Sequence, residues 1–148
     1  MPDIDLVNVS TGIRSKLREL RGKVVCLELW ATWCGPCQET MEKLNQMASE
    51  HRVAWHNRVA IIPLSIDEQP ETVSRHVKQR SWDQVDHYWS GAQGATGWDA
   101  PAVRAVVGQA VPELLIIDRD GRILWRGNPA DKSEGKDVAA RIEEALAQ

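Results

Sequence analysis

The chain has 148 residues, of which 43% are hydrophobic and 26% are charged, and its formal net charge is −3. This length is enough to bury the core of one domain, so we expect residues 1–148 to form a single domain. The charge balance argues against nucleic acid as a partner, and no apolar run approaches the roughly 18 residues of a membrane-spanning helix.

The first clear pattern predicts a buried strand followed by a helix. Residues 21–31 (RGKVVCLELWA) form an almost continuous apolar run, which is typical of a central strand covered on both faces. Glu28 is the conspicuous polar exception within it. From Pro36 to about Arg52, apolar side chains recur at helical spacing, which predicts a helix that begins at the cysteine motif.

The middle of the chain predicts a second strand and helix and then a loop-rich segment. Residues 58–67 read as a buried strand and residues 68–80 as a helix. Residues 81–101 contain three tryptophans, and we expect a short strand at Val85–Trp89 and a short helix from Pro101 to Val107. Two interpretations of this segment stay open: a partner-recognition loop beside an active site, or an insertion whose tryptophans anchor in the core.

The C-terminal third predicts a hairpin and a helix. Residues 111–127 contain two apolar stretches joined by Asp-Arg-Asp-Gly, a turn sequence, and residues 132–148 have an amphipathic helical pattern. Strands that alternate with helices and end in a hairpin and a helix indicate a three-layer α/β sandwich.

The cysteine pair carries the chemistry. Cys34 follows the first buried strand, and Gly35 and Pro36 open the helix, which places Cys34 where free backbone N–H groups and the helix dipole stabilise a thiolate. The thiolate is the nucleophile in disulfide exchange. Cys37 lies one helical turn further on, should be more buried, and can attack a mixed disulfide on Cys34.

Other roles for the pair are less consistent with the sequence. A metal site needs further ligands, but there is no second CxxC and the four histidines do not have zinc-finger spacing. A structural bridge over so short a loop would constrain the unfolded chain little. Inert thiols do not fit the helix-terminal position. Cys26 is expected to be a core residue, and the four histidines are expected at the surface.

The sequence WATWCGPC (30–37) resembles the active-site signature of thioredoxins. Residues 18–34 and 111–127 resemble the TlpA-like branch of that superfamily, which includes the reductases of cytochrome c maturation. The resemblance covers nearly the whole chain. It implies a thioredoxin-like three-layer α/β/α sandwich with a central βα insertion of the TlpA-like type, expected within residues 68–107.

The resemblance also implies roles for single residues. Cys34 corresponds to the attacking cysteine and Cys37 to the resolving one. Trp33 flanks the site, and Pro112 corresponds to a cis-proline that faces the cysteines, so that Val111 can offer its backbone to an extended substrate segment. The alternative for Pro112 is an ordinary trans proline at the start of a strand. The expected substrate-contacting positions are Trp33, Gly35, Pro36, Val111 and Pro112.

Glu28 lies six residues before Cys34, where typical thioredoxins place a buried aspartate that shuttles the proton of the resolving cysteine. Burial would raise the pKa of Glu28 and suit it to accept the Cys37 proton near neutral pH. The alternative is that its side chain reaches an edge of the sheet or pairs with Lys23 or an arginine.

These features predict a thiol–disulfide oxidoreductase that reduces protein disulfides, uses no cofactor or metal and is re-reduced by a second protein. A thioredoxin-fold docking module without redox turnover is the main alternative. A peroxiredoxin-like peroxidase fits less well, because Thr32 lies two rather than three positions before Cys34. By analogy we expect an extracytoplasmic location, either periplasmic or as a membrane-tethered domain, with a cytoplasmic location as the alternative. We expect a monomer, because nothing in the sequence suggests an obligate interface. The departures from the family pattern are Glu42 and Glu113, where many members have proline and threonine.

Overall fold

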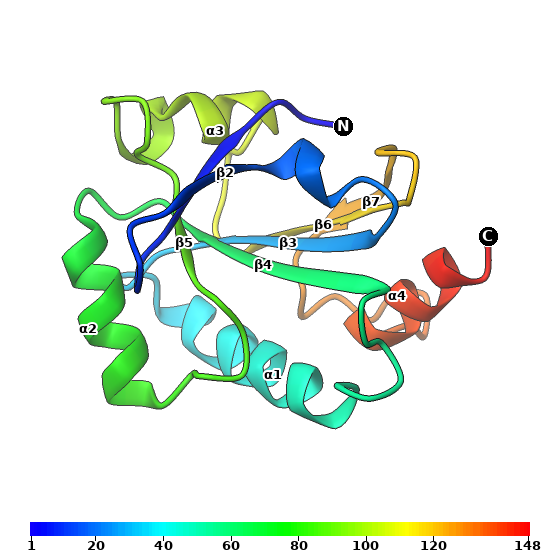
Figure 1. The fold of residues 1–148 in the computed structure, drawn as a ribbon. Coiled ribbons are helices and arrows are strands. Elements are labelled where there is room, and N and C mark those ends of the chain that lie inside the picture. The colour runs from blue at the N-terminus through cyan, green and yellow to red at the C-terminus, as the bar shows by residue number, and fades with distance from the viewer.

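A seven-stranded mixed β-sheet runs through the centre of the molecule (Figure 1), and the computed structural model describes residues 1–148. The strand order is β2-β1-β5-β4-β3-β6-β7. The strands are β1 (Asp5–Asn8), β2 (Arg14–Lys16), β3 (Val24–Trp30), β4 (Val59–Ser65), β5 (Tyr88–Trp89), β6 (Glu113–Ile117) and β7 (Ile123–Gly127). The helices are α1 (Gly35–Glu50), α2 (Pro70–Arg80), α3 (Pro101–Ala105) and α4 (Val138–Leu146), with 3₁₀ turns at Leu17–Leu20 and Gly97–Asp99.

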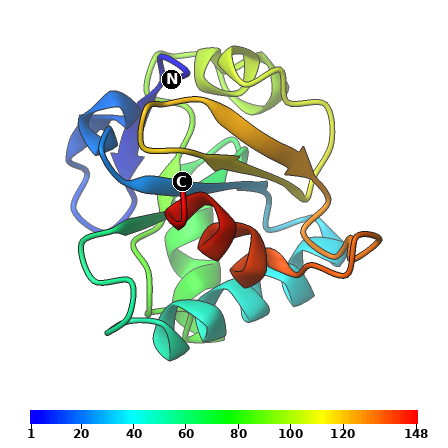
Figure 2. The same cartoon turned by 90° about the vertical axis from the view of Figure 1, so that its right-hand side faces the viewer.

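Helices cover both faces of this sheet. Helices α1, α2 and α4 lie below it in the view of Figure 1, whereas α3 and the first 3₁₀ turn lie above it, and the turned view in Figure 2 shows the same two layers. The architecture is therefore α/β/α, and the predicted thioredoxin-like sandwich is confirmed. No helix is long and apolar enough to cross a membrane.

Strand β3 is the most buried element. It pairs in parallel with β4 on one side and antiparallel with β6 on the other, and all seven of its residues are buried. A strand with neighbours on both edges and helices on both faces has no solvent-facing side, which explains its nearly continuous apolar sequence. Glu28 therefore occupies the very centre of the core.

The arrangement of the central strands brings several segments to one edge of the sheet, namely the edge at which the strands β3 and β4 end rather than an outermost strand. The carboxyl ends of β3 and β4 point to this edge, and α1 begins there. Strand β6 runs antiparallel to β3 with Leu29 opposite Glu113, so Pro112 reaches the same edge just before β6 begins. In α/β sheets ligands and substrates bind preferentially at the carboxyl ends of parallel strands.

Most predicted elements are confirmed, with two differences at the ends of the chain. The apolar pattern does not predict β1 and β2, which are short and only partly buried. The last helix begins at Val138 rather than near residue 132. The Asp137 side chain accepts a hydrogen bond from the Ala140 N–H at 2.8 Å, and Gly135 just before it has a φ of 69°. An N-cap of this kind fixes the first residue of the helix.

The expectation that all four histidines lie at the surface is wrong for His87. This residue is buried, its Nε2 lies 2.8 Å from the Trp82 carbonyl oxygen, and its ring packs edge-on against Trp30. Burial lowers the pKa of His87. The tryptophans of residues 81–101 have different environments: Trp82 is buried in the core, whereas Trp98 is exposed.

Candidate active site

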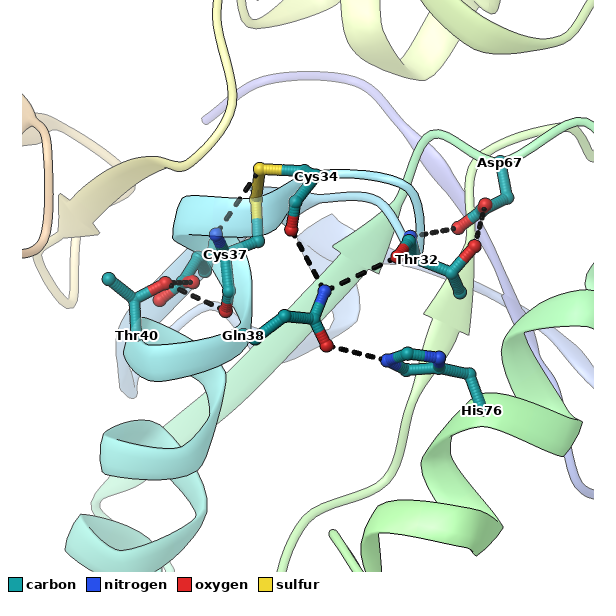
Figure 3. Close-up of a disulfide and its surroundings, with 8 residues drawn as sticks. Thr32, Cys34, Cys37, Gln38, Thr40, Asp67 and His76 are labelled. Atoms are coloured by element: carbon teal, nitrogen blue, oxygen red, sulfur yellow. Dashed lines mark hydrogen bonds between the residues drawn. A yellow bond between two sulfur atoms is a disulfide. The ribbon is translucent and has the colours of Figure 1, made fainter.

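Cys34 and Cys37 form a disulfide at the start of α1, with their Cα atoms 5.3 Å apart (Figure 3). Cys34 is the N-cap residue of the helix. Its backbone is extended, and its sulfur accepts a hydrogen bond from the Cys37 N–H at 3.2 Å. Pro36 lies within the first turn, where its missing N–H leaves no donor unsatisfied. The predicted placement of the pair at a helix N-terminus is therefore found.

The two sulfurs differ in accessibility. Cys34 keeps 6% of its surface exposed, whereas Cys37 is fully buried. Trp33 precedes the pair and is 63% exposed, an unusual state for so large an apolar side chain. An incoming group can thus meet Cys34 beside an exposed indole, while Cys37 can be reached only from inside the protein.

The segment before β6 completes this edge. The Val111–Pro112 peptide bond is cis, as the resemblance implies, so the trans alternative is excluded. Pro112 is buried and Val111 is half-buried. Pro112 lines the same cavity as Pro36 of the cysteine motif, which brings together two segments that are 76 positions apart in the sequence.

Glu28 lies beneath this edge and is fully buried. Its Oε2 accepts a hydrogen bond from the Thr40 hydroxyl at 3.0 Å, and its Oε1 has no hydrogen-bond partner in the protein. No lysine or arginine pairs with it. Desolvation raises the pKa of Glu28 from 4.5 to about 8, and the Thr40 hydrogen bond opposes this rise. The carboxyl group can therefore gain or lose a proton near neutral pH.

A cavity of about 400 Å³ runs along α1 from the cysteine motif toward α4. Glu28, Thr40, Pro36 and Pro112 lie in its lining, and residues 128–139 close its far side. Most of its lining residues are polar. The buried carboxyl group of Glu28 thus lies at a cavity that begins beside Pro36 and Pro112.

Asp67 lies just after the neighbouring strand β4 and holds the loop between β3 and α1. Its carboxylate accepts hydrogen bonds from the Thr32 N–H at 3.0 Å and from the Thr32 hydroxyl at 2.6 Å (Figure 3). It also accepts one from the Ser65 hydroxyl at 2.6 Å. Asp67 is itself buried. The residue two positions before Cys34 is therefore anchored through both its backbone and its side chain.

Gln38 braces the same loop from α1. Its Nε2 donates to the carbonyl oxygens of Thr32 and Cys34 at 3.3 and 2.8 Å, and its Oε1 lies 2.7 Å from His76 Nε2 (Figure 3). Because the amide nitrogen faces two acceptors, the amide oxygen must face a donor, so His76 Nε2 carries a hydrogen. Helix α2 is thereby connected to the active-site loop.

Sequence reasoning missed the four residues that surround the cysteine pair and Glu28. Two of them carried a usable signal: Gln38 directly follows Cys37, and Thr40 lies three positions after Cys37 and therefore on the same face of the helix. The contacts of Asp67 and His76 depend on how distant segments pack and are not visible in a local pattern. The four residues are Gln38, Thr40, Asp67 and His76.

Residues 22–123 match a family model described as thioredoxin-like, which covers more than half of the chain. The chain belongs to the thioredoxin-like family. The fold, the cysteine pair and this match agree, and the predicted membership of the thioredoxin superfamily is confirmed.

Several relatives of this chain are named as thiol-disulfide oxidoreductases. Thiol-disulfide oxidoreductase ResA of Bacillus thuringiensis subsp. konkukian is 26% identical over 135 residues, which are 91% of this chain and 68% of the relative. A ResA of Bacillus cereus is 37% identical over 113 residues, which are 76% of this chain and 59% of the relative. With its CxxC pair in place, the chain is a thioredoxin-like disulfide oxidoreductase, as predicted.

Solved structures show the same fold. A thiol-disulfide oxidoreductase from Bacteroides fragilis superposes with a TM-score of 0.77, covering 97% of this chain and 96% of that one at 19% identity. A Chlorobium tepidum protein described as a thiol:disulfide interchange protein of the DsbE type superposes with a TM-score of 0.76, covering 98% of this chain and 94% of that one at 23% identity.

Proposed function

We propose that this protein reduces disulfide bonds in other proteins by a two-step exchange. The Cys34 thiolate attacks one sulfur of a partner disulfide, which forms a mixed disulfide and releases the other partner sulfur as a thiolate. The Cys37 thiolate then attacks the Cys34 sulfur, so the Cys34–Cys37 disulfide forms and the partner leaves fully reduced. The observation that carries this proposal is the difference between the capped, slightly exposed Cys34 and the fully buried Cys37.

Glu28 acts as the base in the second step. A buried thiol has a high pKa and needs a nearby proton acceptor before it can attack. Burial brings the pKa of Glu28 to about 8, which matches it to a thiol near neutral pH. The full burial of both Glu28 and Cys37 favours a proton transfer that stays inside the protein.

The substrate contacts the edge formed by the cysteine motif and the segment before β6. The exposed indole of Trp33 supplies apolar contact area, and the backbone of Val111, next to the cis Pro112, pairs with an extended substrate segment. Gly35 and Pro36 have no bulky polar groups that would keep a substrate from Cys34. These residues form the proposed substrate surface around the attacking cysteine.

The reducing direction is supported by what surrounds the Cys34 sulfur. One backbone N–H donates to it, and no lysine, arginine or histidine side chain does. Strong oxidants of this superfamily owe their potential to a stabilised reduced form. This donor contacts the sulfur in the disulfide state, and we expect it to stabilise the thiolate only moderately, as in a reductant.

The protein therefore needs two protein partners, a disulfide substrate and an upstream reductant that restores the dithiol. The relation to ResA supports an extracytoplasmic site of action. We further propose that one copy is sufficient for the exchange.

Trapping of the mixed disulfide tests this function. The Cys37→Ser variant, reduced and mixed with an oxidised substrate such as insulin, should accumulate a covalent adduct on Cys34, whereas Cys34→Ser should form none. Wild-type protein with excess dithiothreitol should reduce insulin faster than dithiothreitol alone. Cys26→Ser is the matched control and should behave as wild type. If wild-type protein gives no acceleration and Cys37→Ser forms no adduct, the docking-module alternative replaces the redox function.

A further inference from the structure

The Thr40 hydroxyl lies between the carboxyl group of Glu28 and the backbone carbonyl of Cys37, the resolving cysteine of the proposed function. Its oxygen is 3.0 Å from Glu28 Oε2 and 3.1 Å from the backbone carbonyl oxygen of Cys37. Thr40 is buried on the inner face of α1, so water does not compete freely for its hydroxyl. The side chain therefore connects the turn that carries the resolving cysteine with the buried carboxyl group.

A hydroxyl has one hydrogen to donate and can serve only one of these two acceptors at a time. When Glu28 is ionised, the hydrogen is drawn to its carboxylate, because hydrogen bonds to charged acceptors are the stronger ones. When Glu28 is protonated on Oε2, the carboxyl group donates to Thr40, and Thr40 donates to the Cys37 carbonyl. Rotation of one hydroxyl thus satisfies both protonation states without movement of the backbone.

The same contact distinguishes the two oxygens of Glu28. Oε2 is held by Thr40, whereas Oε1 has no hydrogen-bond partner in the protein. Glu28 and Thr40 both line the cavity of about 400 Å³ beside α1. A carboxyl group fixed through one oxygen presents the other in a constant orientation. Oε1 is then the oxygen that can receive a proton from inside the site.

We propose that Thr40 is a positioning residue for disulfide resolution: its hydroxyl fixes Oε2 of Glu28, stabilises the ionised carboxylate and leaves Oε1 free to accept the Cys37 proton. This inference rests on the proposed role of Glu28 as the base. It assigns to α1 a polar residue whose task is to position the proton acceptor rather than to contact sulfur or substrate.

The Thr40→Val variant tests this inference, because it keeps the shape of the side chain and removes the hydroxyl. Loss of the one donor to the carboxylate should raise the pKa of Glu28 by roughly one pH unit, so that about tenfold less carboxylate is present at neutral pH. Thr40→Ser keeps the hydroxyl, so the pKa of Glu28 in this variant should equal that of the wild type. Thr72→Val on the exposed side of α2 is the matched control.

Two readouts separate this inference from the proposed function. Infrared titration of the Glu28 carboxyl band, assigned with Glu28→Gln, measures the pKa without any turnover. Single-turnover decay of a mixed disulfide with a fluorescent peptide, followed by acid quench across pH, measures resolution. In Thr40→Val, the midpoint of the infrared titration and the midpoint of the pH profile of resolution should both shift upward. Neither midpoint should shift in Thr40→Ser or Thr72→Val.

An unchanged infrared midpoint in Thr40→Val overturns the role of Thr40 and leaves the two-step exchange standing. If the infrared midpoint rises while the pH profile of resolution stays fixed, Glu28 is not the base and the proposed mechanism fails with it. Should Thr40→Val fold poorly in a urea titration, Thr40→Ala removes the same hydroxyl with less bulk and carries the same expectation.

Discussion

The buried carboxyl group of Glu28 should make the stability of the protein fall as pH rises. Between pH 4.5 and about 8 the folded protein keeps a proton on Glu28 that the unfolded chain has already released. Stability decreases with pH wherever the folded state binds more protons than the unfolded state. The contribution of Glu28 is therefore fully present below about pH 4.5, declines through neutral pH and levels off above about pH 8.

The size of this effect follows from the same pKa values. A pKa raised from 4.5 to about 8 corresponds to about 5 kcal/mol at roughly 1.4 kcal/mol per pH unit. This is comparable with the whole stability of about 5–15 kcal/mol of a typical domain. Solvent does not screen the group, because Glu28 is fully buried. Replacing Glu28 by glutamine removes the titrating group and should abolish this decline.

Urea unfolding of the oxidised wild type and of Glu28→Gln from pH 5 to 9 measures the effect. The free energy of unfolding of Glu28→Gln minus that of the wild type should rise by about 4 kcal/mol across this range. The subtraction cancels other titrating groups, including His76 and His87, whose pKa values are lowered by burial. Parallel stability profiles for the two proteins would refute the reasoning, because Glu28 would then be ionised in the folded state.

Three further substitutions probe the surroundings of the cysteine pair. Gln38→Leu removes the donor to the Thr32 and Cys34 carbonyls and should lower the free energy of unfolding in urea by about 1–2 kcal/mol. The control Gln46→Leu, at an exposed position of α1, should lower it by under about 0.5 kcal/mol. Equal losses for the two variants would contradict the bracing role of Gln38. Asp67→Asn disrupts three hydrogen bonds to a buried carboxylate and should lower the free energy of unfolding by about 1–3 kcal/mol, and a loss under about 0.5 kcal/mol would argue against this anchor. Trp33→Ala should leave stability within about 0.5 kcal/mol, because the indole is 63% exposed, but should raise the KM for insulin several-fold; an unchanged KM would remove Trp33 from the substrate surface.

The central elements of the fold could be predicted from the sequence because their patterns are strong and local. Strand β3 is apolar on both faces, α1 has a regular apolar stripe, and the β6–β7 hairpin is joined by turn residues. The strands β1 and β2 are different: they are short, partly exposed and join the sheet through β5, whose pairing with β1 brings together residues some 80 positions apart. Nothing in a short window of sequence indicates such a pairing.

The candidate site also contains some residues that could be predicted from local sequence and others that could not. Cys34 and Cys37 could be identified from their spacing and their position at a helix start, and Glu28 from its conflict with an apolar strand. The partners of these groups could not, because a hydrogen bond between Thr40 and Glu28 depends on how α1 packs against β3. Local sequence shows which residues carry chemistry, and the tertiary packing decides which residues control it.

The reduction potential of the Cys34–Cys37 pair tests the central claim most directly. The protein is equilibrated in dithiothreitol or glutathione buffers of graded potential, and the fraction oxidised is measured by thiol trapping and by tryptophan emission. A reductant should have a potential near that of thioredoxin, about −270 mV. A potential near −120 mV, which is typical of a strong oxidant, would contradict the proposed direction, and a pair that does not cycle at all would contradict the redox function itself.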